Sequence, residues 1–165
     1  MLALLTAPDV GREGGSSPFR IVDAEQPVLS VLDLGATRGD GVFETISVAG
    51  GRAQALDAHL KRLARSAAML DLAPPDLDDW QAAVFAVVAR LPVDREAFVK
   101  LVYTRGIEGT DRPTGWVFGE PSPDHTASRR DGVSVTVLDR GYPHDIAGTA
   151  PVSYTHLTLP TNREV

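Results

Sequence analysis

The stretch RGDGVFETISVAGGRAQALDAHLKRLARSA, residues 38–67, carries the clearest structural signals in this sequence. A run rich in β-branched and aromatic residues leads to Gly50 and Gly51, and a second short run follows, which is typical of a β-hairpin. Asp57 then stands at a helix N-cap position, and the apolar spacing that follows predicts an amphipathic helix over residues 57–70. The apolar positions of that helix are Leu60, Leu63, Ala64, Ala67 and Leu70.

The residues that follow this stretch add a second helix and further strands. APPDLDDWQAAVFAVVARLP predicts a helix with Asp76 as its cap and Pro92 at its stop. Its expected buried stripe is Trp80, Val84, Val87, Val88 and Leu91. EAFVKLVYTRG and GWVFGE have the composition of strands. Because helices and strands do not alternate as in a parallel βαβ sheet, we expect an α+β fold.

The chain is expected to divide near residue 119. GEPSPDHTASRRDG is rich in proline, serine and charge, as in an exposed linker between domains, and the alternating VSVTVLDRG that follows begins a new unit. We therefore predict an N-terminal domain over residues 1–118, a linker over 119–132 and the start of a second, larger domain over 133–150.

Composition excludes several classes of protein. The chain has 165 residues, 43% of them hydrophobic and 23% charged, with 16 basic against 22 acidic side chains, which argues against a nucleic-acid surface. There is no cysteine, and the histidines are scattered without metal-ligand spacing, so no metal site is expected. No apolar run reaches the roughly 20 residues of a membrane span, and no signal peptide is recognisable, so we expect a cytoplasmic protein.

His59 and Arg62 lie three residues apart in the first turns of the predicted helix and can face the same side. Beside a helix N-terminus, such a pair can hold a phosphate through charge-assisted hydrogen bonds. The alternative, which the spacing alone favours because such short pairs are common, is a solvated Arg62 and a His59 that packs under the hairpin.

Residues 38–67 resemble the signature region of the class IV aminotransferases, the fold type IV pyridoxal-phosphate (PLP) enzymes. These include branched-chain and D-amino-acid aminotransferases and 4-amino-4-deoxychorismate lyase. The resemblance rests on GDGVFET, the glycine hairpin and AHLKRL at this spacing, and it extends over about residues 33–150. It implies the N-terminal domain of the D-amino-acid aminotransferase-like fold. It also implies that Arg62 contacts the phosphate of PLP, with His59 in support.

The resemblance assigns further residues one at a time. Phe43 matches an aromatic residue of the substrate pocket, although a plain core aromatic is the alternative. Arg105 matches an arginine that binds a substrate carboxylate, and Tyr103, on the same face of a regular strand, is placed with it; a salt bridge at the strand end is the alternative for Arg105. Thr45 matches a threonine that handles protons in deoxychorismate lyases.

PLP chemistry needs a lysine that bonds covalently to the cofactor and then acts as general base. The sequence has only two lysines, Lys61 and Lys100, and neither matches the position that the resemblance assigns to it. The resemblance stops near Pro151. Residues 152–161 instead look like a translated transposon-end adapter of a sequencing library, so residues 151–165 are expected to be a non-native tail.

The resemblance implies a full-length parent protein that is a homodimeric PLP enzyme acting on a small molecule. We expect elimination of pyruvate from 4-amino-4-deoxychorismate, which gives 4-aminobenzoate and belongs to folate biosynthesis. Transamination of branched-chain or D-amino acids is the alternative. The alternative from another class is that the 165-residue chain, which lacks the catalytic lysine, is a non-catalytic fragment.

Overall fold

The predicted glycine hairpin lies at one edge of a six-stranded antiparallel sheet. In the computed structural model, which describes residues 1–5 and 17–136, β3 (Gly41–Ala49) and β4 (Arg52–Ala53) flank the turn. Gly50 and Gly51 both have positive φ, 55° and 70°. A two-residue hairpin turn requires this conformation, which glycine adopts without a steric penalty. The hairpin prediction is therefore confirmed.

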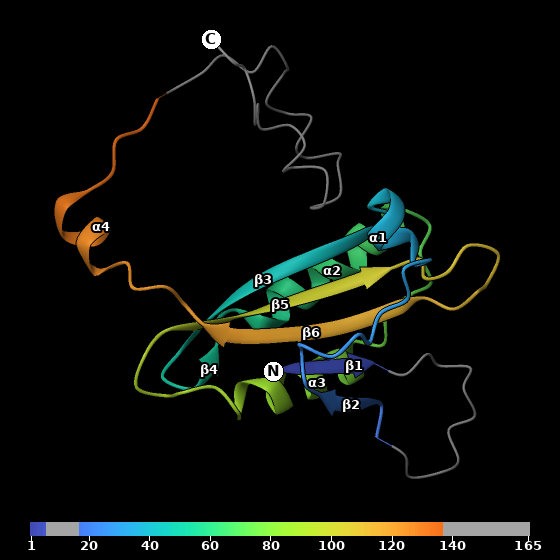
Figure 1. Ribbon diagram of the computed structural model, residues 1–165, viewed down its shortest axis with the longest axis horizontal. Coiled ribbons are helices and arrows are strands. Elements are labelled where there is room, and N and C mark those ends of the chain that lie inside the picture. The colour runs from blue at the N-terminus through green and yellow to red at the C-terminus, as the bar shows by residue number, and fades with distance from the viewer. Residues whose placement is uncertain (6–16, 137–165) are drawn as a thin grey trace.

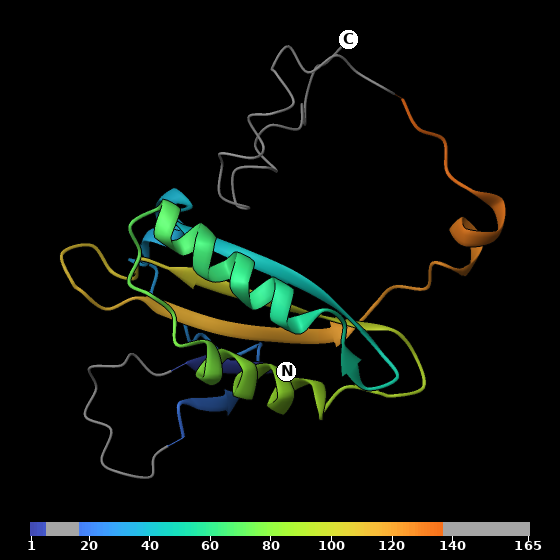
Figure 2. The ribbon, with the colours of Figure 1, turned by 180° about the vertical axis from the view of Figure 1, so that it is seen from behind.

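The remaining strands come from distant parts of the chain (Figure 1). They are β1 (Leu2–Leu5), β2 (Phe19–Val22), β5 (Ala97–Thr104) and β6 (Thr114–Pro121), and the order across the sheet is β2-β1-β6-β5-β3-β4. Helices α2 (Leu56–Met69) and α3 (Leu77–Val88) lie together on one face of this sheet (Figure 2). The mixture of antiparallel strands and packed helices is the expected α+β fold.

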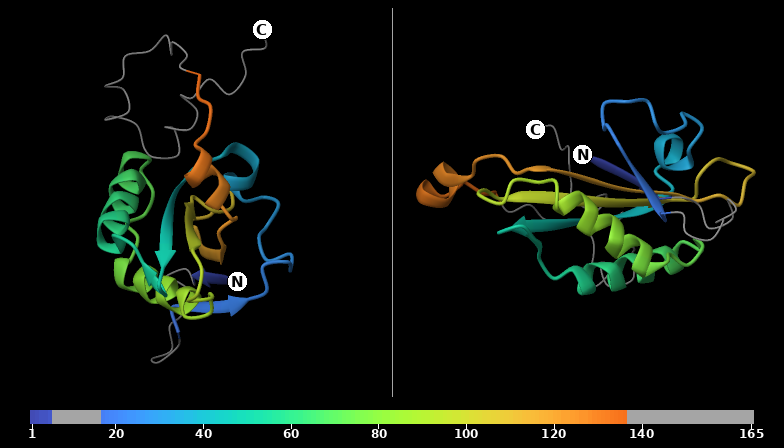
Figure 3. Two further views of the ribbon diagram at one scale, coloured as in Figure 1. Left: turned by 90° about the vertical axis from the view of Figure 1, so that its left-hand side faces the viewer. Right: turned by 90° about the horizontal axis from the view of Figure 1, so that it is seen from below.

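The opposite face of the sheet, which we call the open face, carries neither α2 nor α3. Within the described ranges, the short helix α1 (Leu34–Arg38) and the segment leading to it pass over part of this face (Figure 3, right). Asp33 caps α1 by accepting a hydrogen bond from Gly35 N at 2.8 Å. Residues 1–5 and 17–136 thus cover the open face only in part, and they form a cavity on it.

The core lies between the sheet and the two long helices. Apolar side chains with less than a tenth of their surface exposed come from alternate positions of β3 and β5 and from the predicted stripes of α2 and α3. They include Leu60, Leu63, Ala67, Trp80, Val84, Val87, Val88 and Leu91, all expected in the core from their spacing. Burial of this area from water is the main stabilising contribution to the fold.

The start of α2 differs from the prediction. The N-cap residue is Ala55, in a left-handed conformation with φ 49°, and its side chain makes no capping hydrogen bond. Asp57 lies inside the first turn and pairs instead with Lys61, at 2.7 Å between Oδ2 and Nζ. The predicted cap at Asp57 is wrong because the chain leaves the hairpin two residues earlier and enters the helix directly.

Helix α3 begins as predicted and ends earlier. Asp76 accepts hydrogen bonds from the backbone N–H groups of Asp78 and Asp79 at 3.0 and 3.2 Å, which confirms it as the cap. The helix ends at Val88, before Pro92, and Leu91 enters the core from the turn that follows.

The predicted linker contains ordered elements. Strand β6 continues to Pro121, so residues 119–121 belong to the sheet, and a short exposed helix, α4 (Thr126–Asp131), follows. Residues 137–165, with most of the predicted second domain and all of the predicted tail, lie outside the described residues. None of the helices in the described ranges combines the length and apolar character that a membrane crossing requires.

Candidate active site

Strand β3 divides the candidate site between the two faces of the sheet. Val42, Glu44 and Ile46 face the helices and are buried, whereas Phe43 and Thr45 face the open side. Residues 41–46 pair with β5 on one side, and no other strand of the described chain pairs with them on the other. A ligand at this edge could therefore contact side chains from both faces.

A buried carboxylate, Glu44, contacts both His59 and Arg62, the pair predicted to hold a phosphate. Its side chain has no exposed surface, and its Oε1 accepts a hydrogen bond from Arg62 Nε at 2.7 Å. Its Oε2 accepts from Arg62 Nη2 at 2.5 Å and lies 2.8 Å from His59 Nδ1. The structure thus confirms that His59 and Arg62 face the same side of α2. It also shows that Glu44, on the helix-facing side of β3, binds both.

The short contact with Glu44 determines the role of His59 Nδ1. An ionised carboxylate only accepts hydrogen bonds, so Nδ1 must carry the proton and donate it to Glu44. The Arg62 Nη2 group, 3.3 Å from Nδ1, is also a donor and makes no hydrogen bond with it in this tautomer. In a neutral His59, Nε2 is then an acceptor, and only the imidazolium could donate to an anion.

Arg62 keeps donors for a ligand. Its bonds within the described residues use Nε and Nη2 and leave Nη1 without a partner there, while 43% of the side chain is exposed. The hydrogen bond to Glu44 raises the pKa of Arg62 above its usual value. Partial burial acts in the opposite direction, and the negative charge of Glu44 raises the pKa further. The guanidinium is therefore permanently charged, fixed on one side and accessible on the other.

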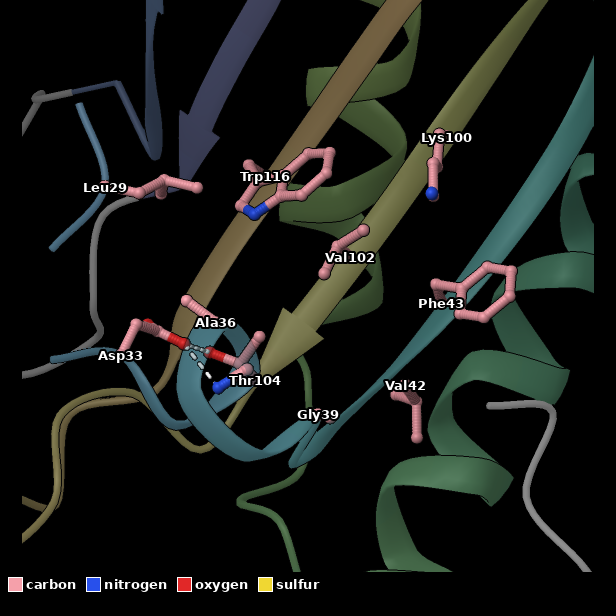
Figure 4. A pocket seen from close by; sticks show the side chains of 12 residues that line it. Leu29, Asp33, Ala36, Gly39, Val42, Phe43, Lys100, Val102, Thr104 and Trp116 are labelled. Atoms are coloured by element: carbon pink, nitrogen blue, oxygen red, sulfur yellow. Dashed lines mark hydrogen bonds between the residues drawn. The ribbon is translucent and has the colours of Figure 1, made fainter. Parts of the chain in front are cut away.

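On the open face, Phe43 lines a cavity of about 420 Å³ (Figure 4). Figure 4 shows Phe43, Lys100 and Trp116 on three neighbouring strands, β3, β5 and β6. Asp33 closes another side, where its Oδ1 accepts a hydrogen bond from Thr104 Oγ1 at 2.8 Å. The walls are mainly apolar, with a few polar groups, which is the usual composition of a pocket for a small molecule.

Thr45 is exposed on the same face, two residue pairs further along the β3–β5 ladder. It is the direct cross-strand partner of Lys100 in the β3–β5 ladder, and Phe43 is the partner of Val102. Side chains of such partners lie close together on one face of a sheet. The structure therefore places the predicted proton-handling residue beside Lys100 and on the same face as Phe43.

Tyr103 lies on the other face of the sheet. It is 6% exposed, its hydroxyl donates to Ala73 O at 2.9 Å, and its ring meets Trp80 edge-to-face with centroids 5.8 Å apart. Burial raises the pKa of Tyr103. The structure does not bring Tyr103 together with Phe43, and its contacts are those of a core residue; its assignment to substrate binding stays a prediction without support from this geometry.

Arg105 forms the salt bridge that was its alternative role. Its Nε and Nη2 contact the carboxylate of Asp40 at 2.8 and 3.3 Å. Nη2 also donates to Leu70 O at 2.7 Å, and Nη1 to Asp71 O at 3.2 Å, just beyond the end of α2. The hydrogen bond with Asp40 raises the pKa of Arg105. Arg105 thus ties β5 to the end of α2, and substrate binding by it stays a prediction.

We expect Arg105→Ala to lower the free energy of unfolding of the 165-residue chain by about 1 kcal/mol. The substitution removes charge-assisted hydrogen bonds to Asp40 and to carbonyls at the end of α2. The expected loss of stability is small because 39% of the Arg105 side chain is exposed, and water screens its charge. Urea unfolding followed by circular dichroism measures this change. Arg38→Ala, which removes an exposed ion pair with Glu108, serves as the control and should change little. Equal effects of the two substitutions would contradict the structural role of Arg105.

Two residues of the site were not identified from the sequence. Glu44 stands between Val42 and Ile46 in the alternation of β3, so a carboxylate was predictable on the core face, where it needs cationic partners. Trp116 alternates with the buried Gly115 and Val117 of β6, which places it on the open face. Its approach to Lys100 depends on the register between β5 and β6, which local sequence does not specify.

Comparison with known proteins supports one family. The family model described as amino-transferase class IV matches residues 41–148. The chain is 44% identical over 134 residues to the Mycobacterium tuberculosis protein named bifunctional aminodeoxychorismate lyase / D-amino acid transaminase, covering 79% of this chain and 46% of that one.

Two solved structures are similar. The fold IV-transaminase CpuTA1 from Curtobacterium pusillum has a TM-score of 0.78 at 49% identity, covering 91% of this chain and 51% of the other. A hypothetical aminotransferase from Mycobacterium tuberculosis in its PLP-bound form has a TM-score of 0.72 at 43% identity, covering 81% and 48%. The chain spans about half the length of these proteins. Because the family model matches residues 41–148, which include the glycine hairpin and helix α2, the chain belongs to the class IV aminotransferase family.

Proposed function

We propose that the parent protein of this chain is a PLP-dependent enzyme whose phosphate site includes Arg62. The observation that supports this most directly is the fixed guanidinium of Arg62, which Glu44 orients from the core, while Nη1 has no partner among the described residues and 43% of the side chain is exposed. A phosphate needs such a fork of donors, so the side chains fit the group. His59 supports Arg62 by sharing the carboxylate of Glu44.

PLP, when bound, acts as the electron sink for bonds at the substrate Cα. The chain's own residues contribute binding and orientation. Arg62 would hold the phosphate on the helix side of β3, and Phe43 would limit the substrate on the open face. The hydroxyl of Thr45, exposed on that same face, would hold or pass a proton. Neither lysine of this sequence takes the cofactor in this proposal, so that residue must come from the parent's remaining sequence.

Our first choice of reaction is the lyase reaction, in which 4-amino-4-deoxychorismate gives 4-aminobenzoate and pyruvate. Thr45 favours it through the resemblance, and the Mycobacterium tuberculosis relative carries the lyase in its name. Transamination is the second candidate, with D-amino acids supported by the same name, which includes a D-amino acid transaminase, and branched-chain amino acids by the resemblance. We also propose that the parent is a homodimer, as the resemblance implies.

Assays of the parent protein with both classes of substrate separate these reactions. The transaminase assays contain 2-oxoglutarate, which accepts the amino group and becomes glutamate. The lyase proposal predicts formation of 4-aminobenzoate, measured by its fluorescence, faster than formation of pyruvate from D-alanine or of the keto acid from leucine. Keto acid formation without 4-aminobenzoate would select the second candidate. If neither product forms with PLP present, the proposed function is wrong.

Arg62→Ala is expected to weaken PLP binding by the parent roughly ten- to a hundredfold, because it removes a charge-assisted contact with the phosphate. Equilibrium dialysis followed by the absorbance of the retained cofactor measures the dissociation constant. Arg65→Ala is the matched control, since Arg65 lies on the same helix and is exposed. Unchanged PLP binding in Arg62→Ala would return Arg62 to a structural role beside Glu44.

A further inference from the structure

Lys100 places a positive charge in the open-face cavity, and no carboxylate of residues 1–5 or 17–136 forms an ion pair with it. Its side chain is half-buried in the middle of β5, between Phe43 and Trp116 (Figure 4). The ion pairs among the described residues are made by Lys61 and by arginines, and none of them includes Lys100. The nearest compensation is the ring of Phe43, whose centroid lies 5.2 Å from Nζ.

An aromatic ring compensates an ammonium group only in part. The cation–π attraction is worth roughly 0.5–1 kcal/mol at sites that water still reaches. The ring offers no lone pair, so it accepts no conventional hydrogen bond from the three N–H donors of the ammonium group. A half-buried ammonium group therefore retains both charge and donors for an anion. Lys100 is therefore a candidate contact for an anionic ligand.

The carboxylates around the cavity are engaged or lie at its margin. Asp33 Oδ1 accepts hydrogen bonds from Gly35 N and Thr104 Oγ1, which hold it in the wall near α1. Asp40 is paired with Arg105. Glu120 lines an adjoining cavity of about 560 Å³ that also contacts Lys100, but it is exposed and forms no ion pair with it. None of the described carboxylates therefore occupies Lys100, which leaves its ammonium group to bind an anion that enters from solvent.

The walls around Lys100 favour a ring. Trp116 borders both cavities, Phe43 borders the first, and Phe98 and Phe118 border the second. Aromatic side chains attract planar apolar groups through their faces and edges. A ligand that fits this arrangement has a ring against Trp116 and Phe43 and a carboxylate that reaches Nζ of Lys100.

We propose that Lys100 is a specificity-determining residue that binds a carboxylate carried by the ring of the substrate. This inference rests on the proposed function in taking the open-face cavity as the substrate pocket. It deepens that function by selecting cyclic acids over amino acids with neutral side chains. It also gives Thr45, the cross-strand partner of Lys100, a position next to the bound carboxylate.

The binding test uses the 165-residue chain, 4-aminobenzoate as the acid probe and 4-aminobenzamide as its neutral analogue. The indole N–H resonance of Trp116 reports binding in NMR titrations, and the resonance of the buried Trp80 is the internal reference. We expect Lys100→Met to raise the dissociation constant of 4-aminobenzoate about tenfold or more, because it removes a charge-assisted contact. The constant for 4-aminobenzamide should stay the same, and Lys100→Arg should retain most of the preference for the acid.

Lys61→Met is the matched control, because it removes the other lysine of the sequence from an exposed position on α2. It should leave both constants unchanged. The inference is overturned if the unchanged chain shows no saturable binding of 4-aminobenzoate, or if Lys100→Met weakens the acid and the amide equally or changes neither.

Kinetics of the parent separate this inference from the proposed function. We expect Lys100→Met to raise the KM for 4-amino-4-deoxychorismate about tenfold with a smaller change in kcat, and to leave the KM for D-alanine unchanged. An unchanged KM for the cyclic acid contradicts the inference while the lyase function stands. If the parent has no activity on either substrate class, the proposed function fails, and the NMR titration still decides whether Lys100 binds a carboxylate.

Discussion

Incubated with PLP and reduced with borohydride, the 165-residue chain is expected to show no stoichiometric labelling of a single lysine and no transaminase or lyase turnover. Its two lysines occupy the wrong places for this chemistry. Lys61 is 70% exposed and paired with Asp57, and Lys100 faces the open side of the sheet, whereas Arg62 binds Glu44 on the helix side. Without a lysine positioned over the cofactor, roughly 10² to 10⁴ in rate is lost from general acid–base catalysis alone.

Peptide mapping of the reduced product tests this expectation together with assays for 4-aminobenzoate and keto acids. Slow, scattered labelling of both lysines would be ordinary chemistry of accessible amines. Stoichiometric labelling of Lys100 with turnover that Lys100→Arg abolishes would show instead that this chain carries its own catalytic lysine. Lys61→Arg is the control, and it should change neither the labelling of Lys100 nor the rate.

The long elements of the fold were predictable because each has a local signal. Trp80, Val84 and Val87 repeat at helical spacing, and all three are buried in α3. Gly50 and Gly51 mark a turn that few other residues can form. The cap at Asp57 was wrong because the conformation of Ala55 depends on how the hairpin packs before the helix, and a preference for aspartate at caps contains no information about that packing.

The site was predictable to the extent that its contacts are local. His59 and Arg62 share a face because they are three residues apart on one helix. Their common partner Glu44 lies 15 and 18 residues away, and only the packing of α2 on β3 brings the three together. Arg105 contacts Asp40 across 65 residues, so its engagement with the end of α2 could be raised as an alternative but not chosen from sequence.

Glu44→Ala is expected to lower the free energy of unfolding by about 3 kcal/mol. It leaves Arg62 and His59 without the carboxylate that all of their short contacts share, and it opens a void under α2. Removing one partner of a buried ion pair typically costs about 3–5 kcal/mol, and we expect the lower end because 43% of the Arg62 side chain is exposed and can be rehydrated. Glu44→Gln should cost less, since an amide oxygen can still accept one hydrogen bond from Arg62.

Denaturant unfolding of the 165-residue chain, followed by circular dichroism, measures both substitutions of Glu44. Asp57→Ala is the matched control: it removes a carboxylate that is 81% exposed and paired with Lys61 on the same helix, and it should change stability by less than about 0.5 kcal/mol. The contrast between these two carboxylates follows mainly from burial, and Glu44 also makes three contacts with two residues where Asp57 makes one with Lys61. If Glu44→Ala were as mild as Asp57→Ala, Glu44 would not anchor α2 on the sheet, and Arg62 would lose its fixed orientation toward a phosphate.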